Sequence, residues 1–244
     1  IPEYMRENGY KVFQSGKVFH SNPKNVWDDK GVPADYGPVA YNGKKAIGHP
    51  SNPAEMAKEL GPLDATFVPL SDVPEIDSSS SGPGYKGWRF SNWQTNRHFN
   101  YVSELERDLL TDEMSAEWFE KKIDWIKQNQ NNNQPFFIAT GFIRPHTPLV
   151  VPKKYYDKFP LNKIKITEKL KDDLIDTKFR ENLKETRGHK AWRLLSQGYG
   201  SEDKGLKIFT QAYLASINFA DEMVGRVLDA LDKSIYAKNT IVIL

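Results

Sequence analysis

The sequence predicts an α/β fold in which a mixed, mostly parallel sheet is sandwiched between helices. Residues 136–143 form an unbroken apolar run of strand length, which is typical of a strand covered on both faces. Two long segments, 111–127 and 203–233, carry apolar residues every three to four positions and so predict amphipathic helices before and after that run. Thr111 is expected to cap the first of these helices. Helices and strands therefore alternate along the chain, as they do in open parallel sheets.

Three shorter segments complete the predicted alternation. Residues 2–8 begin with proline and end before a glycine, which predicts a short helix. Residues 10–15 predict a strand that is closed by glycine, and the β-branched run 240–244 predicts a last strand. Because this run ends the sequence and the chain opens at Ile1, we expect an internal stretch of a larger protein, with a sheet incomplete at both ends.

Residues 21–110 carry a different pattern, and we expect a long irregular insertion that packs on the domain. Nine of the 15 prolines and eight of the 16 glycines lie between residues 21 and 100, so regular periodicity is largely lost. One short helix is predicted, with Asn52 as its N-cap, Pro53 as its first residue and Gly61 as its stop. A structureless linker is the alternative, but a linker does not need aromatic anchors. Five such anchors are present: Trp88, Phe90, Trp93, Phe99 and Tyr101.

Composition excludes several classes of protein. The chain has 244 residues, with 34 Lys and Arg against 32 Asp and Glu, a formal net charge of +2. This balance argues against a nucleic-acid binder that works by neutralising phosphates. No apolar run approaches the length of a membrane span. The sequence contains no cysteine, which excludes disulfides, thiolate metal sites and cysteine nucleophiles within it.

The candidate functional residues follow two of the predicted strands. Lys17 and His20 come directly after the first strand, and Arg144 and His146 come directly after the second. Because ligands of open α/β sheets gather at the carboxyl ends of the strands, we expect these four side chains at one edge. An ammonium group, a guanidinium group and imidazole N–H donors together suit a tetrahedral oxyanion. They also suit a transition state in which charge develops on oxygen.

Each of these residues also has a purely structural interpretation. Lys17 alone is typical of a solvated surface lysine, His20 of a histidine that caps a loop, and Arg144 followed by proline of a rigid exit from a strand. Convergence at one sheet edge is what favours a functional role. The remaining histidines have no comparable strand context and are interpreted as structural: His49, His98 and His189.

Other site patterns are absent from the sequence or ambiguous in it. We find no Gly-rich phosphate loop, no zinc-binding helix with paired histidines, no hydrolase serine elbow and no Asp-rich calcium loop. The basic and aromatic cluster 88–98 suits stacking on a sugar or a base, and it equally suits the core of the long insertion.

In four segments, two of which contain the candidate functional residues, the sequence resembles the type I sulfatases. Residues 16–20, Gly-Lys-Val-Phe-His, resemble the Gly-Lys-(x)-His loop of that family, in the longer-spaced form of iduronate-sulfatase-like members. Residues 136–148 are similar to the family's strand and the loop that follows it, which ends in Arg-Pro-His-Thr-Pro here. Residues 211–221 and 224–231 resemble the helix before the family's second metal-binding strand, and residues 239–244 have the character of that strand.

The resemblance implies the fold of the alkaline-phosphatase superfamily, with residues 1–244 as part of one sulfatase-type catalytic domain. It implies hydrolysis of sulfate esters, with a sulfated glycan as substrate, by a formylglycine beside a calcium ion. Lys17 would hold a sulfate oxygen, His20 would contact the formylglycine hydroxyls, and His146 would hydrogen-bond sulfate or protonate the leaving oxygen. Arg144 would help to recognise an acidic sugar.

The resemblance also predicts what this stretch lacks. The modifiable Cys or Ser and the metal ligands are expected outside residues 1–244, in the remainder of the same catalytic domain. Similar enzymes are secreted or periplasmic, or lysosomal in eukaryotes, and we expect the same here.

Two alternatives stay open at this point. A phosphate or phosphonate monoester hydrolase of the same superfamily would use the same basic groups, because its substrate is a tetrahedral anion of similar size. A non-catalytic module that binds anions or carbohydrates would keep the basic edge without the nucleophile.

Overall fold

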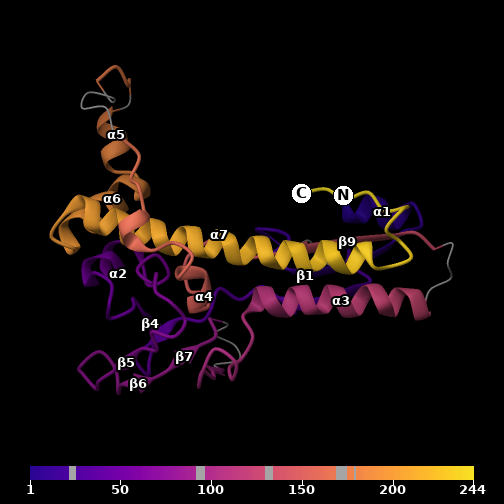
Figure 1. Ribbon diagram of the computed structural model, residues 1–244, viewed down its shortest axis with the longest axis horizontal. Helices are drawn as coiled ribbons and strands as arrows, with labels where there is room; N and C mark the ends of the chain where they lie inside the picture. Colours follow the sequence, from indigo (N-terminus) through magenta and orange to yellow (C-terminus); the bar gives the residue numbers. More distant parts are fainter. Residues whose placement is uncertain (22–25, 92–96, 130–133, 169–174, 179) are drawn as a thin grey trace. The chain divides into compact units, whose positions relative to one another are not determined.

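The chain divides into two compact units. In the computed structural model the first unit comprises residues 1–35, 109–144 and 219–244, and the second comprises residues 36–108 and 145–218. That residues 1–244 belong to one catalytic domain stays a prediction. The structure describes residues 1–21, 26–91, 97–129, 134–168, 175–178 and 180–244 (Figure 1).

The first unit contains the sheet that the sequence predicted. Its elements are α1 (Pro2–Glu7), β1 (Lys11–Gly16), β2 (Asp29–Pro33), α3 (Thr111–Asn129), β9 (Phe136–Gly141) and the C-terminal part of α7 (Glu202–Asp232).

The second unit is built from short elements and the start of α7. Its strands are β3 (Ala40–Tyr41), β4 (Ala46–Ile47), β5 (Glu75–Ile76), β6 (Tyr85–Lys86), β7 (Trp88–Arg89) and β8 (His98–Phe99). Its helices are α2 (Ala54–Leu60), α4 (Lys153–Tyr156), a 3₁₀ turn at Leu161–Lys163, α5 (Arg180–Lys184) and α6 (Arg187–Gly198).

The sheet of the first unit is parallel and has the order β2-β1-β9. Strands β1 and β9 pair residue by residue, from Lys11 opposite Phe136 to Gly16 opposite Gly141. This confirms the predicted parallel α/β arrangement. Strand β2 was not predicted, because its sequence, Asp-Lys-Gly-Val-Pro, lacks the apolar alternation of a strand and forms through its pairing with β1.

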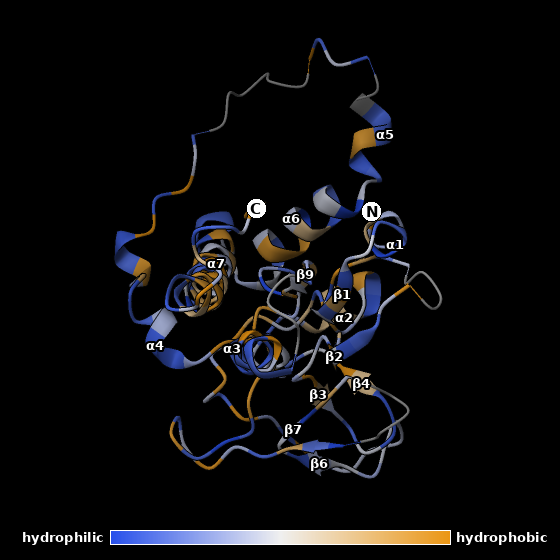
Figure 2. Ribbon diagram, turned by 90° about the vertical axis from the view of Figure 1, so that its right-hand side faces the viewer, coloured by the Kyte–Doolittle hydropathy of each residue, from blue (hydrophilic) through white to orange (hydrophobic). Residues whose placement is uncertain are grey.

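Both faces of the sheet are covered. Phe13 of β1 packs with Phe119 and Ile123 of α3 and with Leu231 of α7, whereas its neighbour Val12 points to the opposite face. There it meets Val26, Trp27 and the partly buried Met5 of α1. The two residues separate because side chains alternate between the faces of a strand. Figure 2 shows both polar and apolar residues on α3 and α7, as expected of helices with one buried face.

Two predictions at element ends are corrected by the structure. The run 240–244 forms no strand, and Ile241, Ile243 and Leu244 are 89%, 88% and 93% exposed. β-Branched residues favour a strand only where a neighbouring strand accepts their hydrogen bonds, and no described strand pairs with this run. Thr111 is the first residue of α3 and not its cap; the Leu110 N–H is instead accepted by the Glu113 carboxylate at 2.7 Å.

Asn52 does not cap α2, which is a further correction. Its side-chain oxygen accepts a hydrogen bond from Phe67 N at 3.0 Å, and its amide donates to the Tyr199 hydroxyl at 3.1 Å. Helix α2 begins after Pro53 without a side-chain cap. The buried Phe67 N–H has a greater need of a partner than a helix end that water reaches. The helix stops before Gly61, which has a φ of +93°, as predicted.

The aromatic anchors form packing contacts within the second unit. Trp88, Phe90 and Phe99 are buried, and the Trp88 indole N–H donates to the Leu70 carbonyl at 2.9 Å. The Phe90 and Phe99 rings lie 5.1 Å apart. These three residues therefore serve as core and not as an open platform for a sugar, whereas Trp93 lies outside the described residues.

His49 is a structural histidine of this core, as the sequence analysis interpreted it. Its Nε2 lies 2.9 Å from the Asp72 carbonyl oxygen, and its Nδ1 accepts from Ser51 N at 3.2 Å. Because a carbonyl only accepts, the proton of the neutral ring is on Nε2. The ring stacks on Trp88 at 5.4 Å. Burial lowers the pKa of His49, and the Asp72 carboxylate and backbone oppose that shift in part.

Gly16 and Gly141 allow a close approach between the ends of β1 and β9. A Cβ atom on Gly16 would overlap the Gly141 carbonyl oxygen and lie 2.8 Å from Ser115 Oγ, and one on Gly141 would overlap the Lys17 carbonyl. Gly16 also has a φ of +72°, which side chains disfavour. The ends of β1 and β9 can therefore meet only if both residues are glycine.

We expect Gly16→Ala to destabilise the protein by at least about 2 kcal/mol, because it combines a backbone clash with a left-handed conformation. The control is Gly225→Ala within α7, where a Cβ has no neighbour within 4 Å. This variant should gain up to about 1 kcal/mol from helix propensity. Urea unfolding measures both free energies; equal effects of the two substitutions would contradict the expectation.

We expect His49→Gln to reduce the loss of stability on acidification. A lowered pKa means that the unfolded state binds the proton more readily, so wild-type stability should fall as the pH drops below about 6.5. The difference in the free energy of unfolding between wild type and His49→Gln should shrink between pH 7.5 and pH 5. His98→Gln, at an exposed histidine of the same unit, is the control. A difference that stays constant with pH would show that His49 is not the responsible group.

Candidate active site

The ends of β1 and β9 bring two cationic loops out of the same edge of the sheet. The strands are parallel neighbours and end at the same level, Gly16 opposite Gly141. Just beyond this pair, Lys17 N donates to the Gly141 carbonyl at 3.1 Å. The Lys17 side chain is half-buried and His20 is exposed. The first loop thus leaves the sheet directly beside the start of the second.

Arg144 is buried. Only 4% of it is exposed, and it lies beside the Asp112 carboxylate. Its predicted role in recognising an acidic sugar stays a prediction. A guanidinium with so little exposed surface offers little contact to a substrate.

Asp112 holds the second loop, a role that the sequence analysis did not identify. Its Oδ1 accepts from Ile143 N at 2.7 Å and its Oδ2 from Arg144 N at 2.9 Å. Burial raises the pKa of Asp112, while the Arg144 charge and the two N–H donors act in the opposite direction. Acidic residues are common in the first turn of helices, so the position of Asp112 gives no sign of a special role. The two N–H groups that it accepts lie more than thirty positions further along the chain. No local sequence signal could have revealed this contact.

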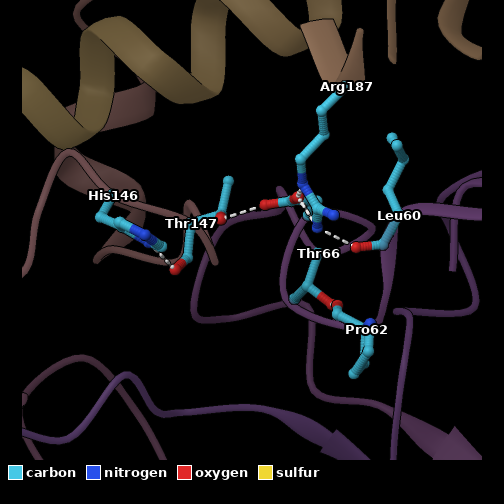
Figure 3. A network of polar contacts seen from close by, with 7 residues as sticks. Leu60, Pro62, Thr66, His146, Thr147 and Arg187 are labelled. Atoms are coloured by element: carbon cyan, nitrogen blue, oxygen red, sulfur yellow. Dashed lines mark hydrogen bonds and ion pairs between the residues drawn. The ribbon is translucent and has the colours of Figure 1, made fainter. Parts of the chain in front are cut away.

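His146 lies in the second unit on the same segment of chain. It is exposed, and its Nδ1 lies 2.6 Å from the Thr147 carbonyl oxygen (Figure 3). Its ring meets the Tyr36 ring edge-on, with 4.9 Å between the ring centroids. Since the carbonyl oxygen can only accept, Nδ1 carries a proton. Nε2 then remains to accept a proton, or to donate one when the ring is charged.

The convergence of all four candidate residues around one anion stays a prediction. Lys17, His20 and Arg144 belong to the first unit and His146 belongs to the second. What the structure supplies is the pairing of β1 with β9, which sets where both loops begin.

The described residues do not make up a metal site. In the described ranges, no group of three or more His, Asp or Glu side chains is arranged so that it could hold a metal ion. None of the described helices is long and apolar enough to cross a lipid bilayer.

A parallel sheet with basic loops at neighbouring strand ends defines an α/β protein with a candidate anion site. The chain belongs to the sulfatase family, whose model matches residues 1–244.

The names of individual relatives agree with the assignment of this chain to the sulfatase family. A sulfatase of Formosa agariphila is 32% identical over 100% of this chain and 40% of its own length. The iduronate 2-sulfatase of Mus musculus is 28% identical over 99% of this chain and 38% of its own length. The chain thus spans about two fifths of these relatives.

One solved structure, a protein in complex with its substrate D-glucosamine-2-N,6-O-disulfate, covers 95% of this chain and 46% of its own. Its sequence is 14% identical to this chain, and the TM-score is 0.42.

We expect Asp112→Asn to destabilise the first unit by about 1–3 kcal/mol. An amide has only one acceptor oxygen, so one of the two N–H groups of residues 143 and 144 would lose its partner. Chemical denaturation measures the loss. Asp221→Asn, at an exposed position of α7, is the matched control and should change stability by less than about 0.5 kcal/mol. Equal effects of the two variants would contradict the role given to Asp112.

Proposed function

We propose that the protein containing this chain hydrolyses sulfate esters, and that Lys17, His20 and His146 contribute to its active site. Family membership over the whole chain supports the reaction class. The observation that carries the proposal for the site is the register of β1 and β9, because it starts both cationic loops at one edge of the sheet.

The proposed roles follow from the chemistry of the side chains. The Lys17 ammonium binds a sulfate oxygen and stabilises the negative charge that grows there in the transition state. His146, whose Nδ1 proton is held by the Thr147 carbonyl, uses Nε2 to hydrogen-bond the sulfate or to protonate the leaving alcohol oxygen as the S–O bond breaks. His20 contacts the hydroxyl groups of the formylglycine.

The proposal places two components outside residues 1–244. The described residues offer no metal site. The sequence has no cysteine, and none of its serines stands in a Ser-x-Pro-x-Arg or Ser-x-Ala-x-Arg stretch from which formylglycine could form. A calcium ion and the formylglycine would come from the rest of the catalytic domain.

We propose a sulfated glycan as the substrate class. Similarity to iduronate 2-sulfatase, whose name specifies a sulfated sugar acid, supports this class. A secreted or periplasmic location, or a lysosomal one in a eukaryote, accompanies the proposal because such glycans are found there.

We expect Lys17→Ala and His146→Ala to lower kcat of the full-length enzyme on an aryl sulfate at least about 100-fold. Loss of one charge-stabilising donor typically costs about 2.7–4 kcal/mol in the transition state. Circular dichroism and thermal unfolding should show little change, because neither side chain is buried. Lys58→Ala, which removes an exposed lysine paired with Glu55 on α2, is the control. Rates near wild type in either active-site variant would overturn the assigned role.

The same assay separates the alternatives. Turnover of an aryl sulfate in preference to an aryl phosphate supports the proposal. A strong preference for the phosphate would identify a phosphate monoester hydrolase. No turnover of either ester, combined with binding of a sulfated glycan, would identify a non-catalytic module.

A further inference from the structure

The loop of His146 is tied to a distant part of the second unit by a chain of polar contacts. The Thr147 hydroxyl donates to Asp64 Oδ1, and Arg187 Nε donates to Asp64 Oδ2 at 2.8 Å. A second guanidinium nitrogen of Arg187 also contacts Asp64 and donates to the Leu60 carbonyl (Figure 3). Three segments that are far apart in the sequence therefore meet at one carboxylate.

The turn that carries Asp64 is itself fixed. The Thr66 hydroxyl donates to the Pro62 carbonyl at 2.9 Å and accepts from His49 N at 3.2 Å. The Thr66 carbonyl in turn accepts from Leu149 N at 2.8 Å, two residues beyond Thr147. The chain after His146 is thus held against residues 64–66 by a side-chain bond and a backbone bond.

His146 needs this support because little else directs its ring. It is exposed, and its ring contacts the edge of Tyr36 and the carbonyl of its neighbour Thr147. An exposed histidine ordinarily samples several rotamers. The direction of Nε2 here depends on the Thr147 peptide group, and the Thr147 side chain anchors that group to Asp64. Misplacing a catalytic group by about 1 Å can reduce the rate about 100-fold.

We propose that Thr147 and Asp64 are positioning residues that orient His146, with Arg187 holding the Asp64 carboxylate in place. This inference rests on the proposed function, since it assumes that His146 acts on the substrate. It adds residues that the sequence analysis did not single out: Asp64, Thr147 and Arg187.

The test compares Thr147→Val with Thr147→Ser in the full-length enzyme. Valine keeps the shape of threonine and loses the hydroxyl, whereas serine keeps the hydroxyl. We expect Thr147→Val to lower kcat on an aryl sulfate about 10-fold with KM nearly unchanged, and Thr147→Ser to retain most of the wild-type rate. Asp64→Ala should lower kcat similarly. The double variant Asp64→Ala with Thr147→Val should be no slower than the slower single variant, because both remove one contact.

The matched control is Glu59→Gln. Glu59 pairs with Arg193 of α6 at 3.2 Å, so the variant removes an ion pair between α2 and α6 that does not involve Thr147. It should leave kcat unchanged. Nitrogen-15 NMR of His146 gives a readout independent of turnover: wild type should show the proton on Nδ1, and Thr147→Val should show a mixture of tautomers.

The outcomes distinguish the two proposals. A wild-type enzyme without sulfatase turnover overturns the proposed function, and the NMR comparison then decides the positioning role alone. An active wild type with Thr147→Val at the wild-type rate and tautomer overturns the positioning role. Equal losses of kcat and thermal stability in Thr147→Val, Thr147→Ser and Glu59→Gln would also overturn it, because they would reflect a general loss of stability.

Discussion

The parallel contact between β1 and β9 is the constraint on which the candidate site depends. At the end of this contact two glycines face each other, and a side chain on either would overlap the backbone of the opposite segment. Because the strands stay in contact to their last residues, the Lys17 loop and the Arg144 loop begin at the same level of the sheet. The common starting level of the two loops is therefore a consequence of backbone packing between two strands that lie more than one hundred residues apart.

Carboxylates then fix the course of the second loop. Asp112 accepts the backbone N–H groups of Ile143 and Arg144 in the first unit, and Asp64 accepts the Thr147 hydroxyl in the second. The two acids therefore hold the segment on either side of His146. An irregular backbone cannot satisfy its own N–H groups, so side-chain acceptors from elsewhere in the chain give it a defined conformation. In catalytic sites on loops, such support is what replaces the regular hydrogen bonding of helices and strands.

Residues of the same type have contrasting roles in this chain, and burial separates them. The Lys122 side chain is 10% exposed, lies 2.5 Å from an Asp29 carboxylate oxygen and is 4.4 Å from the Trp125 ring centroid. It fixes β2 to α3 and has no freedom to meet a ligand. Lys17 is half-buried and leaves the sheet at the strand end. His49 is likewise locked in the core by two hydrogen bonds and a stacked ring, whereas His146 is exposed.

The sequence by itself determined the elements whose signal is local. Of the apolar run 136–143, residues 136–141 form strand β9, which is half-buried along its length. The periodic segments became α3 and α7, and the sulfatase resemblance identified the family of the chain. The features that depend on a partner far away in the sequence were decided by the tertiary structure alone. Strand β2 forms because β1 lies beside it. The run 240–244 forms no strand and pairs with none of the described strands, and Asn52 accepts a hydrogen bond from Phe67 N in place of capping a helix. Asp64 and Asp112 resemble ordinary surface acids in the sequence, because the groups that they hold lie 83 and 31 or 32 positions away. Hydrogen bonds over such separations depend on how the whole chain folds and not on local pattern.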